Sequence, residues 1–352
     1  MVWKLPQNLK EKDSNLALDV VDLFGDTQET FLADFDWAAE CRDEDDIELD
    51  RKFAEKLNQA MAGYRAKLQP DDEVIILSVD AATTGRLAVT YYQEVPGNEF
   101  IDRVLHWHQN CTWPRWIKLH ETKKWVFINN TAPSPNEIAL AAYGTEQEKG
   151  YLTCNDKLRK ATIRRSLPCI IGLSPKIPAD IVKAAVNRAS NPQAYSSFVW
   201  QNCVAPVACA MIKYNEFDGK VNSMELEKDR SYLFGQLLAI LEKVEERALY
   251  LQESKTDDRL TNAKKMWNVY TRRPAITYER LYSHIVRAYL KRLNPGARAK
   301  IENKIMQIIN VLRETDGFNN NPLNERYLLG YYEEREKLIK SKGEKSNEGG
   351  EE

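Results

Sequence analysis

The sequence predicts an α+β fold: a mixed α/β N-terminal part with a β-hairpin, followed by a C-terminal α-helical bundle. Two runs rich in β-branched and aromatic residues, 74–79 and 86–92, predict neighbouring strands. Gly85 lies between them and can take the positive φ of a hairpin turn. From residue 179 onward the apolar residues recur at helical spacing rather than in alternation. These three observations decide the fold class.

The helical half is predicted from its periodicity. Leu233, Leu237, Leu241 and Val244 recur every three or four residues and give that segment one apolar face. The same spacing predicts helices over 179–190, 194–215, 223–253, 257–271, 277–293, 297–315 and 323–341.

Composition and charge divide the chain into four parts. Residues 1–58 form an acidic segment with 16 acidic and 7 basic side chains. We expect a mixed α/β body over 59–178, the helical bundle over 179–342 and a disordered polar tail over 343–352. The whole chain has 352 residues, of which 43% are hydrophobic and 29% charged, as in ordinary globular proteins.

Several classes of function are excluded. No apolar run approaches the roughly 18 residues of a membrane span, and the six cysteines form no CxxC pair, which indicates free thiols in a reducing cytoplasm. His106 and His108 would lie about 200° apart on one helix, so they could not share a metal ion. Phosphate-binding glycine loops and a nucleophile elbow are absent from the sequence. We therefore expect no catalytic residues, no metal and no cofactor.

The most informative feature is a basic module. Residues 259–300 carry 11 Lys and Arg side chains but a single acid, Glu279. On an ideal α-helix Arg280, His284, Arg287 and Lys291 would form one narrow stripe, with Leu281, Ile285 and Ala288 turned to the core. The predicted nucleic-acid contacts are Lys264, Lys265, Arg272, Arg273, Arg280, Arg287, Lys291, Arg298 and Lys300. A secondary basic cluster on the helix predicted over 155–165 comprises Lys160, Arg164 and Arg165.

Unneutralised positive charge repels itself unless a polyanion lies against it, so the module favours phosphate contacts, which give affinity without reading sequence. The alternatives are an ordinary solvated face, an acidic protein partner, or the chain's own acidic N-terminal segment.

Three segments resemble signatures of the large subunit of the type I-C CRISPR surveillance complex (Cascade). They are the hairpin from Val74 to Tyr92, followed by Phe100 and Trp107-His108; the segment Tyr232–Ala248; and Tyr327–Leu338 with its Gly-Tyr-Tyr motif. The sequence departs from the family at Glu245 and Glu333, where a glutamine and a histidine are expected. Family members are usually longer, with an N-terminal region that reads the protospacer-adjacent motif, so this chain is expected to hold the later, C-terminal portion.

The resemblance implies a non-catalytic subunit of an RNA-guided antiviral complex. Its helical bundle resembles the small subunit of the complex and would hold target and displaced DNA strands by their phosphates, while guide RNA supplies sequence specificity. The implied partners are the other Cascade subunits, the guide RNA, the DNA strands and a helicase–nuclease, with no membrane. The main alternative is a protein–protein adaptor whose basic bundle binds an acidic partner without contacting DNA; a metal-dependent nuclease is a third.

Overall fold

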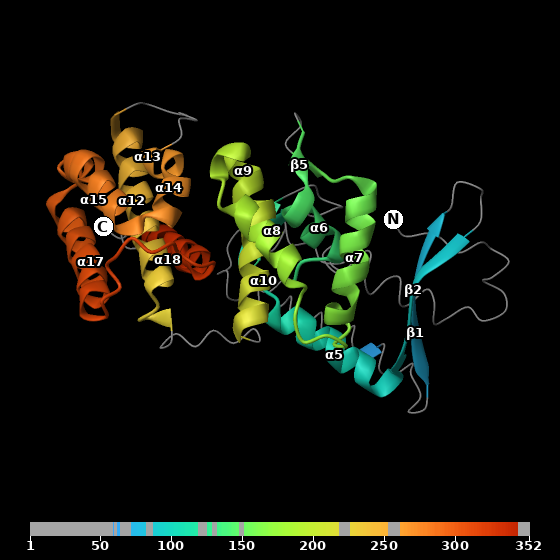
Figure 1. Ribbon diagram of the computed structural model, residues 1–352. Coiled ribbons are helices and arrows are strands. Elements are labelled where there is room, and N and C mark those ends of the chain that lie inside the picture. The colour runs from blue at the N-terminus through green and yellow to red at the C-terminus, as the bar shows by residue number, and fades with distance from the viewer. Residues whose placement is uncertain are drawn as a thin grey trace, which may run out of the picture. The chain divides into compact units, whose positions relative to one another are not determined.

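The computed structural model describes residues 59, 62–63, 72–81, 87–118, 125–128, 132–147, 151–217, 226–252 and 261–343. The described residues form two compact units (Figure 1). Unit 1 takes those of Met1–Ala185 and Phe198–Lys220, and unit 2 takes those of Val186–Ser197 and Val221–Glu352. The sequence predicted a helical bundle from residue 179, whereas Phe198–Lys220 belongs with the hairpin unit. The acidic segment 1–58 and residues 344–352 lie outside the described residues.

The predicted hairpin is present. Strands β1 (Glu73–Ala81) and β2 (Leu87–Pro96) pair antiparallel, with Val74 opposite Val95 and Leu77 opposite Tyr92, and the register shifts between Ser78 and Val79. Helix α5 (Gly97–Asn110) follows at once and buries Phe100, Ile101 and Val104 against one face of the hairpin. Together with the helices that follow, this confirms the α+β fold class.

The rest of unit 1 is short strand pairs and helices. Two small antiparallel ladders join β3 (Arg115–Lys118) to β4 (Trp125–Ile128) and β5 (Thr145–Glu146) to β6 (Leu152–Thr153). The helices are α6 (Pro135–Tyr143), α7 (Asp156–Ile170), α9 (Ser197–Val199), a π-helical turn Trp200–Val204, and α10 (Ala205–Phe217). Helix α8 (Ala179–Ala189) begins in unit 1 and ends in unit 2.

Unit 2 is helical. A short 3-10 turn, Pro192–Ala194, precedes α12 (Arg230–Gln252), α13 (Asn262–Lys265), α14 (Trp267–Arg272) and α15 (Pro274–Leu281). A π-helical turn (Tyr282–Val286) then joins α15 to α16 (Arg287–Leu290), and α17 (Pro295–Glu314) and α18 (Arg326–Gly343) complete the unit. No helix in the described ranges is long and apolar enough to cross a membrane.

A close helix crossing organises unit 2. Helices α12 and α18 carry the same short pattern, Tyr-Leu-x-Gly, at 232–235 and 327–330. A Cβ atom on Gly235 would lie 2.0 Å from the carbonyl oxygen of Tyr327, and one on Gly330 would lie 2.0 Å from the carbonyl oxygen of Tyr232. Only glycine allows the two backbones to meet this closely, so the two glycines set the spacing between α12 and α18.

Candidate nucleic-acid interface

The predicted basic module is presented by the helices from α13 to α17 in unit 2. Local capping explains where they begin: the Thr261 hydroxyl accepts a hydrogen bond from the Lys264 amide at 3.2 Å, and the Asn294 side chain accepts one from the Ala297 amide at 2.8 Å. Pro274 and Pro295 stand first in α15 and α17, where a missing amide hydrogen costs nothing. The basic residues therefore lie on short, well-delimited helices.

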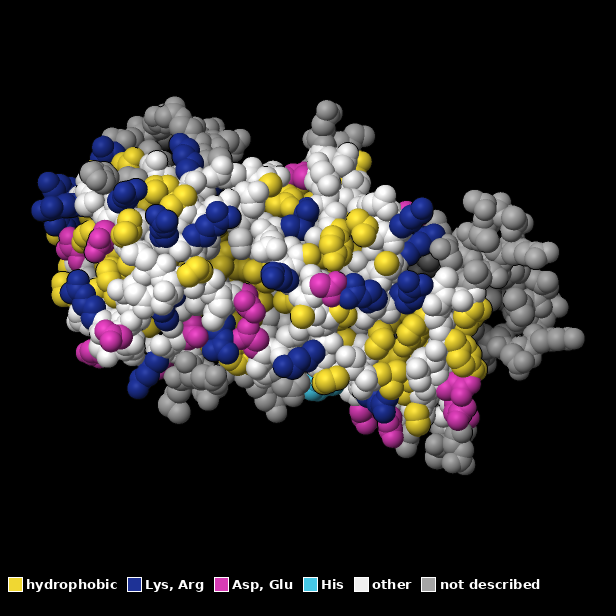
Figure 2. Space-filling model, in the orientation of Figure 1, with side chains coloured by type: hydrophobic (Ala, Val, Ile, Leu, Met, Phe, Trp, Pro, Cys, Tyr) yellow, Lys and Arg dark blue, Asp and Glu magenta, His cyan; other side chains and the backbone are white. Residues whose placement is uncertain are grey.

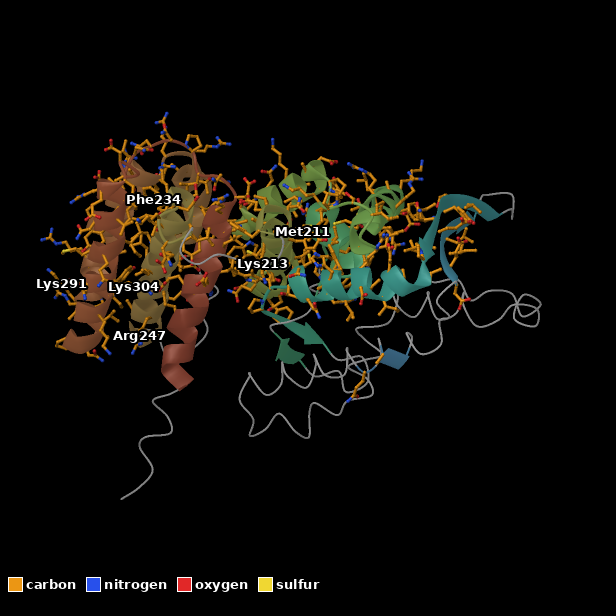
Figure 3. The ribbon with its side chains drawn as sticks, turned by 90° about the horizontal axis from the view of Figure 1, so that it is seen from below. Met211, Lys213, Phe234, Arg247, Lys291 and Lys304 are labelled. Carbon is orange, nitrogen blue, oxygen red and sulfur yellow. The ribbon has the colours of Figure 1, made fainter. Side chains whose placement is uncertain are left out.

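Most of the predicted contacts are exposed. Within the described ranges, these side chains make no ion pair: Lys265, Arg272, Arg273, Arg280, Arg287, Lys291 and Lys300. Glu279 is the only acid between residues 261 and 300, and it is exposed as well. Basic side chains gather over α13 to α15 (Figure 2), and Lys291 points away from the helices while Phe234 lies among them (Figure 3). This surface carries positive charge that its own described residues leave largely uncompensated.

The expected narrow stripe is wrong in its geometry. The π-helical turn Tyr282–Val286 adds one residue to the turn, which rotates everything after it by about 100° relative to an unbroken α-helix. The burial pattern follows this shift, because Val286 and Leu290 are buried after Leu281 whereas Ala288, which was expected in the core, is exposed. Arg280 therefore faces a different direction from Arg287 and Lys291, and the cations form a broad surface.

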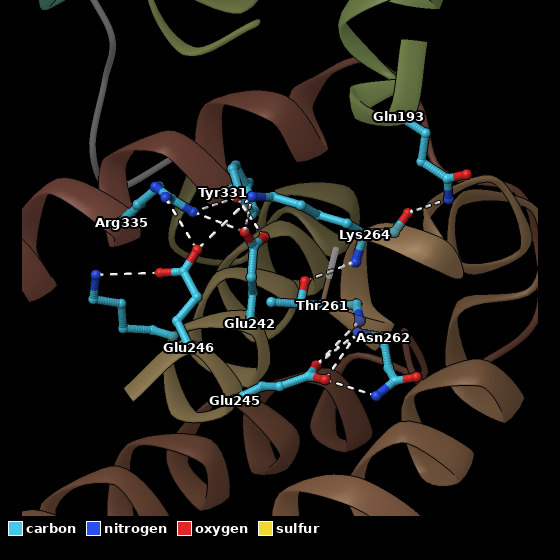
Figure 4. A network of polar contacts seen from close by, with 11 residues as sticks. Gln193, Glu242, Glu245, Glu246, Thr261, Asn262, Lys264, Tyr331 and Arg335 are labelled. Carbon is cyan, nitrogen blue, oxygen red and sulfur yellow. Dashed lines mark hydrogen bonds and ion pairs between the residues drawn. The ribbon is translucent and has the colours of Figure 1, made fainter. Parts of the chain in front are cut away.

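The prediction that Lys264 contacts nucleic acid is also wrong. Its side chain is only 11% exposed, and its ammonium lies 3.2 Å from a carboxylate oxygen of Glu242 and 3.8 Å from one of Glu246. Both acids come from α12, and Arg335 of α18 contacts the same two carboxylates at 2.9 and 3.3 Å (Figure 4). The charge of Lys264 is neutralised inside unit 2, so this residue holds α13 in place and is not available to a phosphate.

The buried network also fixes the start of the basic module. The Glu245 carboxylate accepts hydrogen bonds from the Asn262 amide at 2.8 and 2.9 Å and from its side-chain amide at 2.6 Å (Figure 4). Tyr331 donates to Glu242 at 2.5 Å. Burial alone would raise the pKa of Glu246, but the charges of Arg335, Lys243 and Lys264 outweigh it and hold that pKa at about 2. The Glu246 carboxylate is therefore ionised, and it helps to anchor α13 through Lys264.

Three further predicted contacts have acidic neighbours. Arg298 lies 2.9 Å from Glu302, one turn along α17. In the secondary cluster on α7 of unit 1, Arg165 makes two hydrogen bonds to Asp180, at 2.7 and 2.6 Å, and this contact lowers the pKa of Asp180. Lys160 lies 3.9 Å from Asp156, and Arg164 is exposed. The surface ion pairs are open to solvent and would exchange readily for other anions.

Comparison with known proteins then decides the family. The family model of the CRISPR-associated protein Cas_Csd1 matches residues 10–339. The chain belongs to the Csd1 family. This confirms the resemblance to the large subunit of the type I-C CRISPR complex. No curated protein matches the chain.

The family-like segments now have structural roles. Two of them carry the glycines of the α12–α18 crossing, and the Gly-Tyr-Tyr motif places Tyr331 in the buried network. Both departures from the family pattern are accommodated: Glu245 accepts from Asn262, and Glu333 accepts a hydrogen bond from the Tyr232 hydroxyl at 2.6 Å. In this Csd1-family chain, the family-like segments Tyr232–Ala248 and Tyr327–Leu338 form the closely packed scaffold of unit 2.

The sequence reasoning missed one residue pair at this surface. The Arg292 guanidinium lies 5.0 Å from the centre of the Tyr289 ring, and Arg292 is exposed. Their i, i+3 spacing was the available signal. A guanidinium held over a tyrosine ring offers both a positive charge and a flat surface, which suits contact with a nucleic-acid strand.

The histidines and cysteines are also candidate metal ligands and reactive groups. Among the described residues no group of three or more His, Cys, Asp or Glu side chains could hold a metal ion. His106 is exposed, beside Asn110, while burial lowers the pKa of His108 to about 4. The cysteines of the described part form no disulfide.

Proposed function

We propose that this CRISPR-associated chain is a non-catalytic subunit of an RNA-guided type I-C surveillance complex and holds separated DNA strands by their phosphates. The basic helices α13 to α17 would contact the strand backbone, and the secondary cluster on α7 would add a further contact. The chain would work with the other Cascade subunits and guide RNA in the cytoplasm and would support recruitment of the helicase–nuclease that cuts the DNA.

The observation that carries the proposal is the exposed, uncompensated charge of unit 2. Exposed Lys and Arg side chains bind phosphates by releasing condensed counterions, which gives affinity without sequence preference. In an RNA-guided complex, base pairing with the guide RNA reads the DNA sequence. The protein surface therefore needs to bind only the sugar-phosphate backbone of the strand. Exposed cations spread over several short helices with a single intervening acid fit that task.

Salt-dependent binding of single-stranded DNA tests the proposal. We expect the logarithm of the binding constant to fall linearly with the logarithm of salt concentration, by about 0.7 per phosphate contact. Replacing Arg280, Arg287 and Lys291 with Ala should flatten the slope by about two units. Because all three side chains are exposed, the melting temperature should change little.

The matched control removes the same charge elsewhere. Lys176, Lys183 and Arg247 are also exposed, and their triple replacement with Ala should leave the slope near that of the parent chain. An equal loss in both triple variants would mean that net charge alone drives binding. No affinity for DNA, either free or within the assembled complex, would favour the adaptor function, with an acidic protein on the basic surface.

A further inference from the structure

The β1–β2 hairpin of unit 1 presents an apolar face to solvent. Its inner face buries Val74, Ile76 and Val95. On the outer surface, Ile75, Leu77, Val89 and Tyr92 are 47%, 50%, 59% and 53% exposed. Leu77 and Tyr92 are direct cross-strand partners. Single exposed apolar side chains are common on protein surfaces, whereas a contiguous group of them marks an interaction site. This face is therefore a candidate binding surface.

The hairpin is also open at its edges. Within the described residues β1 and β2 form a two-stranded sheet, and no third strand pairs with either. Each strand therefore has one outward row of backbone N–H and C=O groups that another strand can pair with. A two-stranded hairpin gains stability when a further strand is added, so the geometry suits an added strand.

Charge identifies the kind of partner. The described strands β1 and β2 contain the acids Glu73, Asp80 and Glu94 and no Lys or Arg. Glu73 and Glu94 are exposed, Glu94 lies opposite Ile75, and Tyr92 donates a hydrogen bond to it. Figure 2 shows hydrophobic side chains on the hairpin with acidic ones beside them. Carboxylates repel phosphates and attract Lys or Arg, so this face fits protein rather than nucleic acid.

We propose that the hairpin pairs at one open edge with a β-strand of a neighbouring protein subunit, whose alternate apolar side chains would continue the exposed apolar face and whose Lys or Arg would lie near Glu73 and Glu94. Main-chain pairing would supply affinity, and the contacts to Leu77 and Tyr92 would supply specificity. A second copy of this chain is a poorer occupant, because a two-fold interface would bring the same carboxylates to both sides. The inference rests on the proposed function, which places the chain among other subunits.

The test is incorporation into the complex. The full chain would be co-expressed with the other subunits of its complex and guide RNA, and the complex purified through a tag on another subunit. We expect the double variant Leu77→Ser/Tyr92→Ser to reduce the amount of this chain in the complex about tenfold, as for loss of an interface anchor. The control Leu158→Ser/Leu173→Ser replaces two exposed apolar residues of the same unit, 48% and 41% exposed, and should incorporate normally.

A second variant keeps the test independent of hairpin folding. Glu73→Lys/Glu94→Lys leaves the apolar face intact, and it should reduce incorporation most strongly at low salt, because charge repulsion is screened as salt rises. Normal incorporation of both hairpin variants would overturn the inference. So would a dimer of the parent chain that these variants dissociate, since the occupant would then be a second copy. If the parent chain itself does not enter the complex, the proposed function fails instead.

Discussion

A methyl group at the α12–α18 crossing should loosen unit 2. In Gly235→Ala the new Cβ would lie 2.0 Å from the Tyr327 carbonyl oxygen and 2.9 Å from the Tyr331 amide nitrogen. Ordinary van der Waals contact begins near 3.4 Å, so the helices must part by more than about 1 Å at a place where both neighbours are backbone atoms that cannot rotate aside.

The cost can be bounded from general magnitudes. Overpacking of a closely packed contact costs about 1–3 kcal/mol or more, and alanine's better helix propensity returns about 1 kcal/mol. We expect a net loss of about 2 kcal/mol for Gly235→Ala and for Gly330→Ala, seen as a fall of about 4–8 °C in melting temperature. Thermal unfolding followed by circular dichroism measures it.

Gly296→Ala is the matched control. Gly296 lies near the start of α17, and its new Cβ would come no closer than 4.0 Å to its nearest neighbour, the Asn294 side chain. The same substitution should therefore leave the melting temperature unchanged or raise it slightly. If Gly235→Ala, Gly330→Ala and Gly296→Ala have the same melting temperature, the α12–α18 crossing does not depend on glycine, and the description of the scaffold is refuted.

Three further predictions concern buried charges. Burial lowers the pKa of His108 from 6.5 to about 4, so between these pH values the unfolded chain binds a proton that the folded chain does not. Unit 1 should therefore lose stability as pH falls from 6.5 towards 4, and urea titrations of His108→Gln should no longer show this loss. The pKa of Glu246 is lowered from 4.5 to about 2, so its ionised form contributes about 3 kcal/mol to the free energy of unfolding. This contribution is present above pH 4.5 and is lost as pH falls towards 2, and Glu246→Gln should remove that pH dependence. Lys264→Ala removes an ion-pair partner from Glu242, which is fully buried, and should lower the free energy of unfolding in urea by about 3 kcal/mol. Lys265→Ala, at the exposed neighbouring position, should lower it by almost nothing. Equal effects of the two substitutions would mean that Lys264 lies at the surface.

The sequence predicted most of the architecture because local signals were strong. β-branched runs on either side of Gly85 specified the hairpin, and the apolar spacing from Leu233 onward specified α12. The paired Tyr-Leu-x-Gly segments were visible as well, and their similarity could have indicated a close helix crossing. Patterns that act within one element can be read without knowing what packs against it.

The errors came from features that depend on distant residues or irregular geometry. A helical wheel assumes 100° per residue, so it could not place Arg287 and Lys291 beyond a π-helical turn. The burial of Lys264 depends on Glu242 and Glu246, which lie about twenty positions earlier on another helix. Charge counting identified the basic module but could not separate its scaffold lysine from its surface cations.

Lysine acetylation measured by mass spectrometry, with and without bound single-stranded DNA, tests the central claim most directly. DNA should protect Lys265, Lys291 and Lys300, which are exposed on the basic helices, and leave Lys176 and Lys183 of unit 1 reactive. Lys264, buried against carboxylates, should react slowly in both states. Equal modification of Lys265, Lys291 and Lys300 in the presence and absence of bound DNA would contradict the claim that a strand lies on this surface.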